Sequence, residues 1–143
     1  MTSNTKAPIW FWIVAVIALV WNAMGVMAYI MQVTMSPEDM AALPEAERAL
    51  YADLPGWYTG AFALAVFGGA VASLALLLRK ISAYLLYIIS FLGIVSQMFY
   101  NFFMSKAAEV YGPGGMVMPM MVLVFGIVFI FFSKSAKEKG WIT

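Results

Sequence analysis

The chain has 143 residues, of which 64% are hydrophobic and only 10% are charged, and its formal net charge is +1. This composition excludes a soluble globular domain, which carries far more charge, and indicates an integral membrane protein. Cysteine and histidine are absent, which excludes disulfides, thiolate nucleophiles and histidine-ligated zinc or haem. Residues 1–143 are expected to form a single transmembrane domain, because one hydrophobic unit uses nearly the whole chain.

The first expected span covers residues 9–31 and is apolar apart from Asn22. A helix that rises about 1.5 Å per residue crosses a hydrocarbon core of about 30 Å over this length. The run is too long for the core of a signal peptide, so we expect it to be retained. The acidic loop that follows, residues 36–54, combines Ser-Pro and Pro-Glu helix starts with apolar residues at helical spacing. This pattern predicts a short amphipathic helix, or two, on the outer membrane surface.

The second expected span, residues 58–78, is uncharged and ends at Arg79-Lys80. Small residues recur along one of its faces, where another helix backbone can approach closely. The residues expected to pack in this way are Ala61, Ala65, Gly68, Gly69, Ala72 and Ser73.

The third and fourth expected spans cover residues 81–104 and 116–132, with a glycine-rich turn between them. Four spans predict an all-α membrane protein built as a four-transmembrane-helix bundle. The number of spans places the N-terminal, Arg79-Lys80 and C-terminal segments on one face of the membrane. That face carries most of the basic residues: Lys6, Arg79, Lys80, Lys134, Lys137 and Lys139. Basic residues concentrate on the cytoplasmic side of membrane proteins, so both termini are expected in the cytoplasm.

Chemistry within the spans is limited to neutral polar groups, because no acidic or basic residue lies inside any of them. A proton-coupled carrier generally needs a titrating group at depth, so that class is disfavoured. Ser73, Ser90 and Ser96 have no histidine or lysine nearby to act as a base, so we expect no enzyme activity and no catalytic residue. The methionines are expected to pack rather than to bind copper, and we expect no metal and no cofactor. The basic residues are accounted for by topology, so no nucleic acid is expected as a partner.

Two amides, Asn22 on the first span and Gln97 on the third, are expected at similar depth and within reach of each other. One interpretation is hydrogen bonding between helices, which contributes about 0.6–2 kcal/mol per pair. The other is a pocket for an uncharged polar solute, with amides as hydrogen-bonding groups and aromatic rings as flat walls. The candidate solute-binding residues are Asn22, Gln97, Asn101, Trp21, Tyr29 and Tyr100.

The chain resembles a group of small four-span bacterial membrane proteins whose members are often named "sugar transporter". The resemblance rests on Trp21-Asn22-x-x-Gly25, the acidic loop, Arg79-Lys80 and the turn at residues 109–115. It implies a multi-pass protein of the bacterial inner membrane, and it favours a sugar-like neutral solute. No functional residues are carried over from the group.

Two functions of different classes follow from these observations. The first is non-enzymatic binding or passive transport of a small neutral polar solute, for which a homo-oligomer is expected because four packed helices enclose little volume. The second is a structural or accessory subunit that uses the small-residue face of residues 61–73 against a larger membrane protein.

The expected orientation is tested by cysteine labelling, for which the chain is suited because it contains no cysteine. In intact cells, an impermeant maleimide should label Arg48→Cys and should leave Lys137→Cys unlabelled until the membrane is permeabilised. Labelling of Lys137→Cys before permeabilisation would reverse the orientation.

Overall fold

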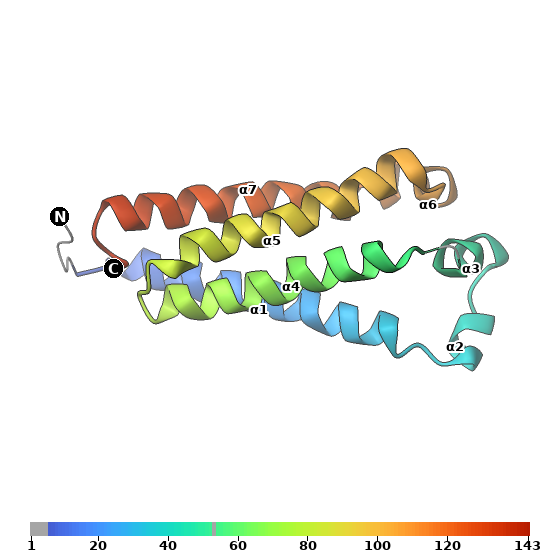
Figure 1. Cartoon of the computed structure of the whole chain (residues 1–143), viewed down its shortest axis with the longest axis horizontal. Coiled ribbons are helices and arrows are strands. Elements are labelled where there is room, and N and C mark those ends of the chain that lie inside the picture. Colours follow the sequence, from blue (N-terminus) through green and yellow to red (C-terminus); the bar gives the residue numbers. More distant parts are fainter. Residues whose placement is uncertain (1–5, 53) are drawn as a thin grey trace.

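The computed structural model describes residues 6–52 and 54–143, and every regular element in that part of the chain is a helix. The four long helices are α1 (Ile9–Val33), α4 (Gly56–Leu77), α5 (Ser82–Phe99) and α7 (Val117–Glu138). The short elements are α2 (Pro37–Ala41), α3 (Glu45–Ala52), α6 (Ala107–Gly115) and the π-helix η1 (Tyr100–Met104). The start of α1 and the C-terminus lie at one end of the bundle, and α2, α3 and α6 lie at the other (Figure 1).

In the part of the chain that the structure describes, four helices, counting α5 and η1 as one, are long and apolar enough to cross a membrane, which confirms the predicted four-helix bundle. The fourth helix differs from the expectation, because α7 continues beyond residue 132 to Glu138. Packing holds the added turns: Ser133 and Ala136 are buried, and the Lys137 ammonium lies 5.2 Å from the centre of the Tyr84 ring. The two short helices α2 and α3 lie within the predicted amphipathic segment, and the membrane face on which they lie stays a prediction.

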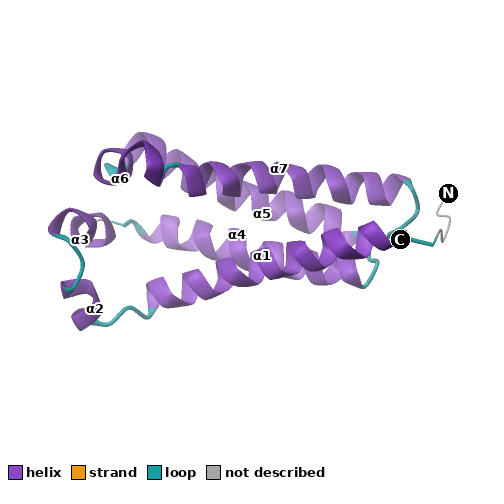
Figure 2. Cartoon of the chain, turned by 180° about the vertical axis from the view of Figure 1, so that it is seen from behind, coloured by secondary structure: helices purple, strands orange, loops and turns teal. Residues whose placement is uncertain are grey.

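The closely packed pairs among the long helices of the described chain are α1–α4, α4–α5 and α5–α7. Helices that are consecutive in the sequence are therefore neighbours in space, and α1 and α7 are left on either side of a more open seam. Figure 2 shows α1 and α7 moving apart towards the end that carries α3 and α6. We call this the α1–α7 seam.

Helix α4 packs closely against both of its neighbours through its small residues. A Cβ on Gly93 of α5 would lie 2.6 Å from the carbonyl oxygen of Ala61 and 2.8 Å from the nitrogen of Ala65. On the α1 side, a Cβ on Gly69 would overlap the Asn22 amide. The small-residue face of α4 is therefore occupied within the chain by α5 and α1, and Ala65, Gly69, Ala72 and Ser73 are all buried.

The C-terminal residues close the end of the bundle that carries the termini. Trp141 and Ile142 are buried, and the Trp141 ring lies edge-on to Trp10 and Phe11 with centroids 5.1 and 5.8 Å apart. The Arg79 Nε donates to the Trp141 carbonyl oxygen at 2.7 Å, and the Thr143 nitrogen donates to the Arg79 carbonyl oxygen at 3.1 Å. These contacts tie the chain end to the turn between α4 and α5.

The close approach of α4 and α5 predicts that Gly93→Ala destabilises the protein. The added methyl group would force the two backbones apart, at a cost of about 1–3 kcal/mol for overpacking. Thermal unfolding in a mild detergent should show a lower midpoint for this variant. Gly60→Ala on α4 is the matched control, because a Cβ there meets nothing within 4 Å, and its midpoint should be unchanged or slightly raised. Equal midpoints for the two variants would contradict the close contact.

Candidate functional site

The bundle contains a cavity of about 380 Å³ in the half that faces α3 and α6, and we call it the bundle cavity. All four long helices and η1 contribute to its walls, which are mainly apolar. The amides on its surface come from three elements: Asn22 on α1, Gln97 on α5 and Asn101 on η1. Its volume lies within the range of about 300–1,000 Å³ that is typical of small-molecule sites.

Asn22 borders this cavity, but its amide serves helix packing. The Nδ2 donates to the Ala18 carbonyl oxygen at 2.9 Å and to the Ser73 Oγ at 3.3 Å. The Ser73 hydroxyl donates in turn to the Gly69 carbonyl oxygen at 2.8 Å. Because that bond uses the only serine proton, Tyr87 must be the donor in its 2.7 Å contact with Ser73. This buried network links α1, α4 and α5, so the interhelical bond of Asn22 goes to Ser73 rather than to Gln97.

Gln97 of α5 is buried, lines the cavity and contacts Tyr58 of α4. Its Nε2 donates to the Tyr58 hydroxyl at a long distance of 3.5 Å. A bond of this length is weak, so it holds the Gln97 amide only loosely.

Asn101 is half-buried, and within the described residues its side-chain amide has no hydrogen-bond partner. It sits in η1, where the chain leaves the α-helix and the Ser105 nitrogen donates to the Tyr100 carbonyl oxygen at 2.8 Å. Single π-helical turns are rare in proteins overall, and many of those that occur lie at functional sites. An unengaged amide with two donors and an acceptor, placed on a cavity wall, is suited to hold a neutral ligand.

A second hollow of about 180 Å³ lies between α3, α6 and the ends of the long helices, and we call it the vestibule. Its polar lining consists of Gln32, Tyr51, Tyr58, Tyr100, Asn101, Ser105 and Tyr111. Burial raises the pKa of Tyr111, and the neighbouring Tyr51 and Glu47 raise it further. The Tyr111 hydroxyl therefore stays protonated and able to donate at physiological pH.

The structure brings most of the predicted solute-binding residues to these two hollows. Trp21 lines the bundle cavity with the three amides, and its ring meets Phe125 across the α1–α7 seam, with centroids 4.6 Å apart. Tyr100 lines the vestibule. Tyr29 lies elsewhere: its ring is edge-on to Phe62 and Phe67 of α4, with centroids 5.3 and 5.5 Å apart, and it lines neither hollow.

The vestibule residues Tyr51, Tyr58, Tyr111 and Ser105 were not predicted as site residues. Tyr58 and Tyr111 each lie beside a proline-glycine break, and such breaks return the chain to the mouth of a bundle. For Tyr58 and Tyr111, this position next to a proline-glycine break was the signal in the sequence that could have identified them.

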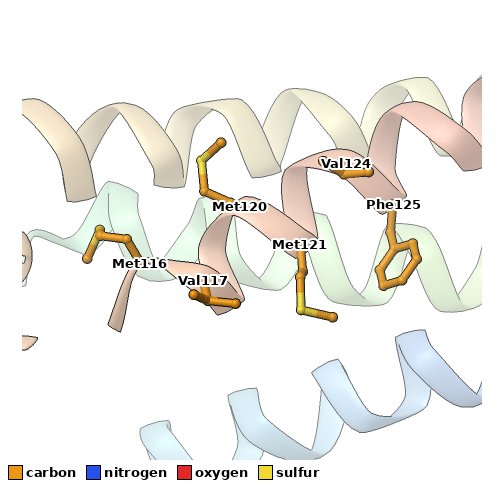
Figure 3. A pocket seen from close by; sticks show the side chains of 6 residues that line it. All are labelled: Met116, Val117, Met120, Met121, Val124 and Phe125. Atoms are coloured by element: carbon orange, nitrogen blue, oxygen red, sulfur yellow. The ribbon is translucent and has the colours of Figure 1, made fainter. Parts of the chain in front are cut away.

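A third hollow, of about 380 Å³, is a groove along the first turns of α7, lined by Met116, Val117, Met120, Met121, Val124 and Phe125. Figure 3 shows Met121 and Phe125 pointing from α7 towards α1. The lining is apolar and comes from one segment of the chain, so it offers no group that orients a ligand.

Within the described residues, no cluster of acidic side chains is arranged to hold a metal ion.

The fold and the site define a helical bundle with four candidate transmembrane helices, as in a multi-pass membrane protein, with a mainly apolar cavity in one half of the bundle. Comparison with models of protein families, with curated proteins and with solved structures finds no match to this chain in any of the three.

The different hydrogen bonding of the two asparagines predicts different effects on stability. Asn22→Leu should lower the unfolding midpoint, because it removes the bond to Ser73 at a cost of about 0.6–2 kcal/mol. Asn101→Leu should leave the midpoint nearly unchanged, because no bond within the described residues is lost. Thermal unfolding of both variants in the same detergent measures this difference. A larger loss for Asn101→Leu would show that its amide has a structural role.

Proposed function

We propose that this chain is a non-enzymatic protein of the bacterial inner membrane, with both termini in the cytoplasm, that binds a small neutral solute in the bundle cavity. The observation that carries the proposal is Asn101, whose amide has no hydrogen-bond partner among the described residues and lies on the wall of a cavity large enough for a small molecule. Loosely held Gln97 lies on the same wall and supplies a second amide.

The absence of charged residues from the walls of the two hollows supports a neutral ligand. Among the described residues that line the bundle cavity and the vestibule, none is acidic or basic. Placing an ion in the mainly apolar bundle cavity would cost several kcal/mol, because no charge of opposite sign lines it to offset the lost hydration. Amides combined with aromatic rings suit hydroxyl-bearing solutes such as sugars, and both are present.

Binding is better supported than an open path through the bundle. Aromatic rings fill the half of the bundle nearer to the termini: Tyr87 and Phe129 lie with centroids 5.5 Å apart, and Phe11 stacks on Phe132 at 5.7 Å. Passive transport would require these rings to move, whereas binding in the other half requires no rearrangement.

The proposal predicts that a neutral solute raises the thermal stability of the protein in nanodiscs and that Asn101→Leu weakens this effect. Losing one hydrogen bond of about 1–1.4 kcal/mol should raise the dissociation constant about five- to tenfold. Glucose, glycerol and 1-octanol are suitable first probes, and octanoate and octylamine serve as charged comparisons.

Ser96→Ala is the matched control, because Ser96 lies on the same helix as Gln97 and donates to the carbonyl oxygen of Leu92 in its own backbone. Its response to solutes should equal that of the native protein. If no neutral probe protects the protein while a fixed membrane partner copurifies at constant ratio, the accessory-subunit function is favoured instead.

A further inference from the structure

The bundle cavity and the vestibule adjoin each other. Asn101 and Pro119 line both hollows, so these two residues stand at the junction between them. Pro119 lies in the first turn of α7, where it costs no helical hydrogen bond and presents no N–H to the junction. A single molecule that occupied both hollows would therefore meet the Asn101 amide between its two parts.

The two hollows differ in chemistry. The bundle cavity has apolar walls built from residues such as Val66, Ile94 and Met98. The vestibule carries the hydroxyl groups of Tyr51, Tyr58 and Tyr111 in a much smaller space. An apolar group is favoured in the bundle cavity, because a polar group of the ligand would find few partners there. A group with several hydroxyls is favoured in the vestibule, because an apolar group would leave the tyrosine hydroxyls unpaired.

The bundle cavity is also accessible from the side of the bundle. Its rim at the α1–α7 seam includes Met24 and Met118, whose side chains are 62% and 58% exposed. These two helices are not closely packed against each other, and α1 and α7 diverge towards this end (Figures 1 and 2). In a bilayer, this part of the protein surface would face lipid, so an apolar chain can reach the cavity without crossing water.

We infer that the ligand is a neutral amphiphile with one apolar chain and a hydroxyl-bearing head group. The chain enters the bundle cavity through the α1–α7 seam, and the head group occupies the vestibule under α3 and α6. This inference rests on the proposed function and adds the ligand class and a second subsite. It also accounts for why the apolar cavity and the tyrosine-lined vestibule meet at Asn101.

The test compares three probes in nanodiscs: octyl glucoside below its micelle-forming concentration, free glucose as the head alone, and 1-octanol as the chain alone. Thermal unfolding is followed against probe concentration. Octyl glucoside should bind at least tenfold more tightly than either part. Octyl sulfate has the same chain with an anionic head, and it should bind no more tightly than 1-octanol.

Variants separate the two subsites. Tyr111→Phe removes one vestibule hydroxyl and should weaken octyl glucoside about fivefold without changing 1-octanol. Ala28→Trp fills the exposed rim of the bundle cavity and should weaken both probes. The matched control for Tyr111→Phe is Tyr84→Phe, at the start of α5 and far from the vestibule. The matched control for Ala28→Trp is Ala23→Trp, on exposed α1 surface that lines neither hollow. Both controls should bind the probes like the native protein. All variants face the same partitioning of the probes into lipid, so differences between them report on the protein.

Failure of this inference and failure of the proposed function give different results. The two-part site is wrong if 1-octanol binds as tightly as octyl glucoside, or if Tyr111→Phe leaves the binding of octyl glucoside unchanged. In either case, weaker binding of the neutral probes to Asn101→Leu would still support the proposed function. Preferred binding of octyl sulfate would overturn the neutral head group. If none of the three neutral probes changes the unfolding midpoint in a way that depends on Asn101, both proposals fail.

Discussion

The close packing of α4 against both α1 and α5 is the constraint on which the rest of the structure depends. Helices in lipid gain no hydrophobic free energy from meeting each other, so they associate where small residues let many atoms come into contact. Gly93 faces the backbone at Ala61 and Ala65, and Gly69 leaves room for the Asn22 amide. Gly126 similarly lets α7 approach Phe91 and Ile94 of α5. These contacts set the order α1, α4, α5, α7 across the bundle.

The cavity follows from the pair of helices that these contacts leave out. No glycine brings α1 to α7 in the described chain, and the two helices meet through large rings instead. Trp10 and Phe11 contact Phe132, and Trp21 contacts Phe125. These ring contacts, together with the buried C-terminal Trp141, fill the half of the bundle nearer to the termini. Towards the end that carries α3 and α6 the two helices diverge (Figure 2), and the bundle cavity, walled by all four long helices and η1, lies in that half of the bundle.

The polar side chains of the bundle have one of two roles, helix packing or lining the hollows, depending on whether they already form hydrogen bonds within the protein. The amide nitrogen of Asn22 is committed to Ala18 and Ser73, and Ser73 is itself saturated by Gly69 and Tyr87. That network resists a change of helix position, because each member would lose a bond in a medium that offers no replacement. Asn101 carries no such commitment, because η1 turns it towards the two hollows instead of a helix neighbour. The same residue type therefore serves packing in one place and is free for a ligand in the other.

The sequence alone determined the number of long helices, their approximate bounds and the small-residue face of α4, because hydrophobic length and residue size act locally along one helix. It also brought together Trp21, Asn22, Gln97 and Asn101 as candidates, since depth follows from counting residues. The sequence did not predict that Tyr29 lies away from the cavity or that Asn22 bonds to Ser73. It also did not predict that Trp141 is buried or that a π-helix forms at Asn101. Each of these depends on which helix is the neighbour and how it is rotated. Only the tertiary structure decided them, because packing between helices joins residues that are far apart in the chain.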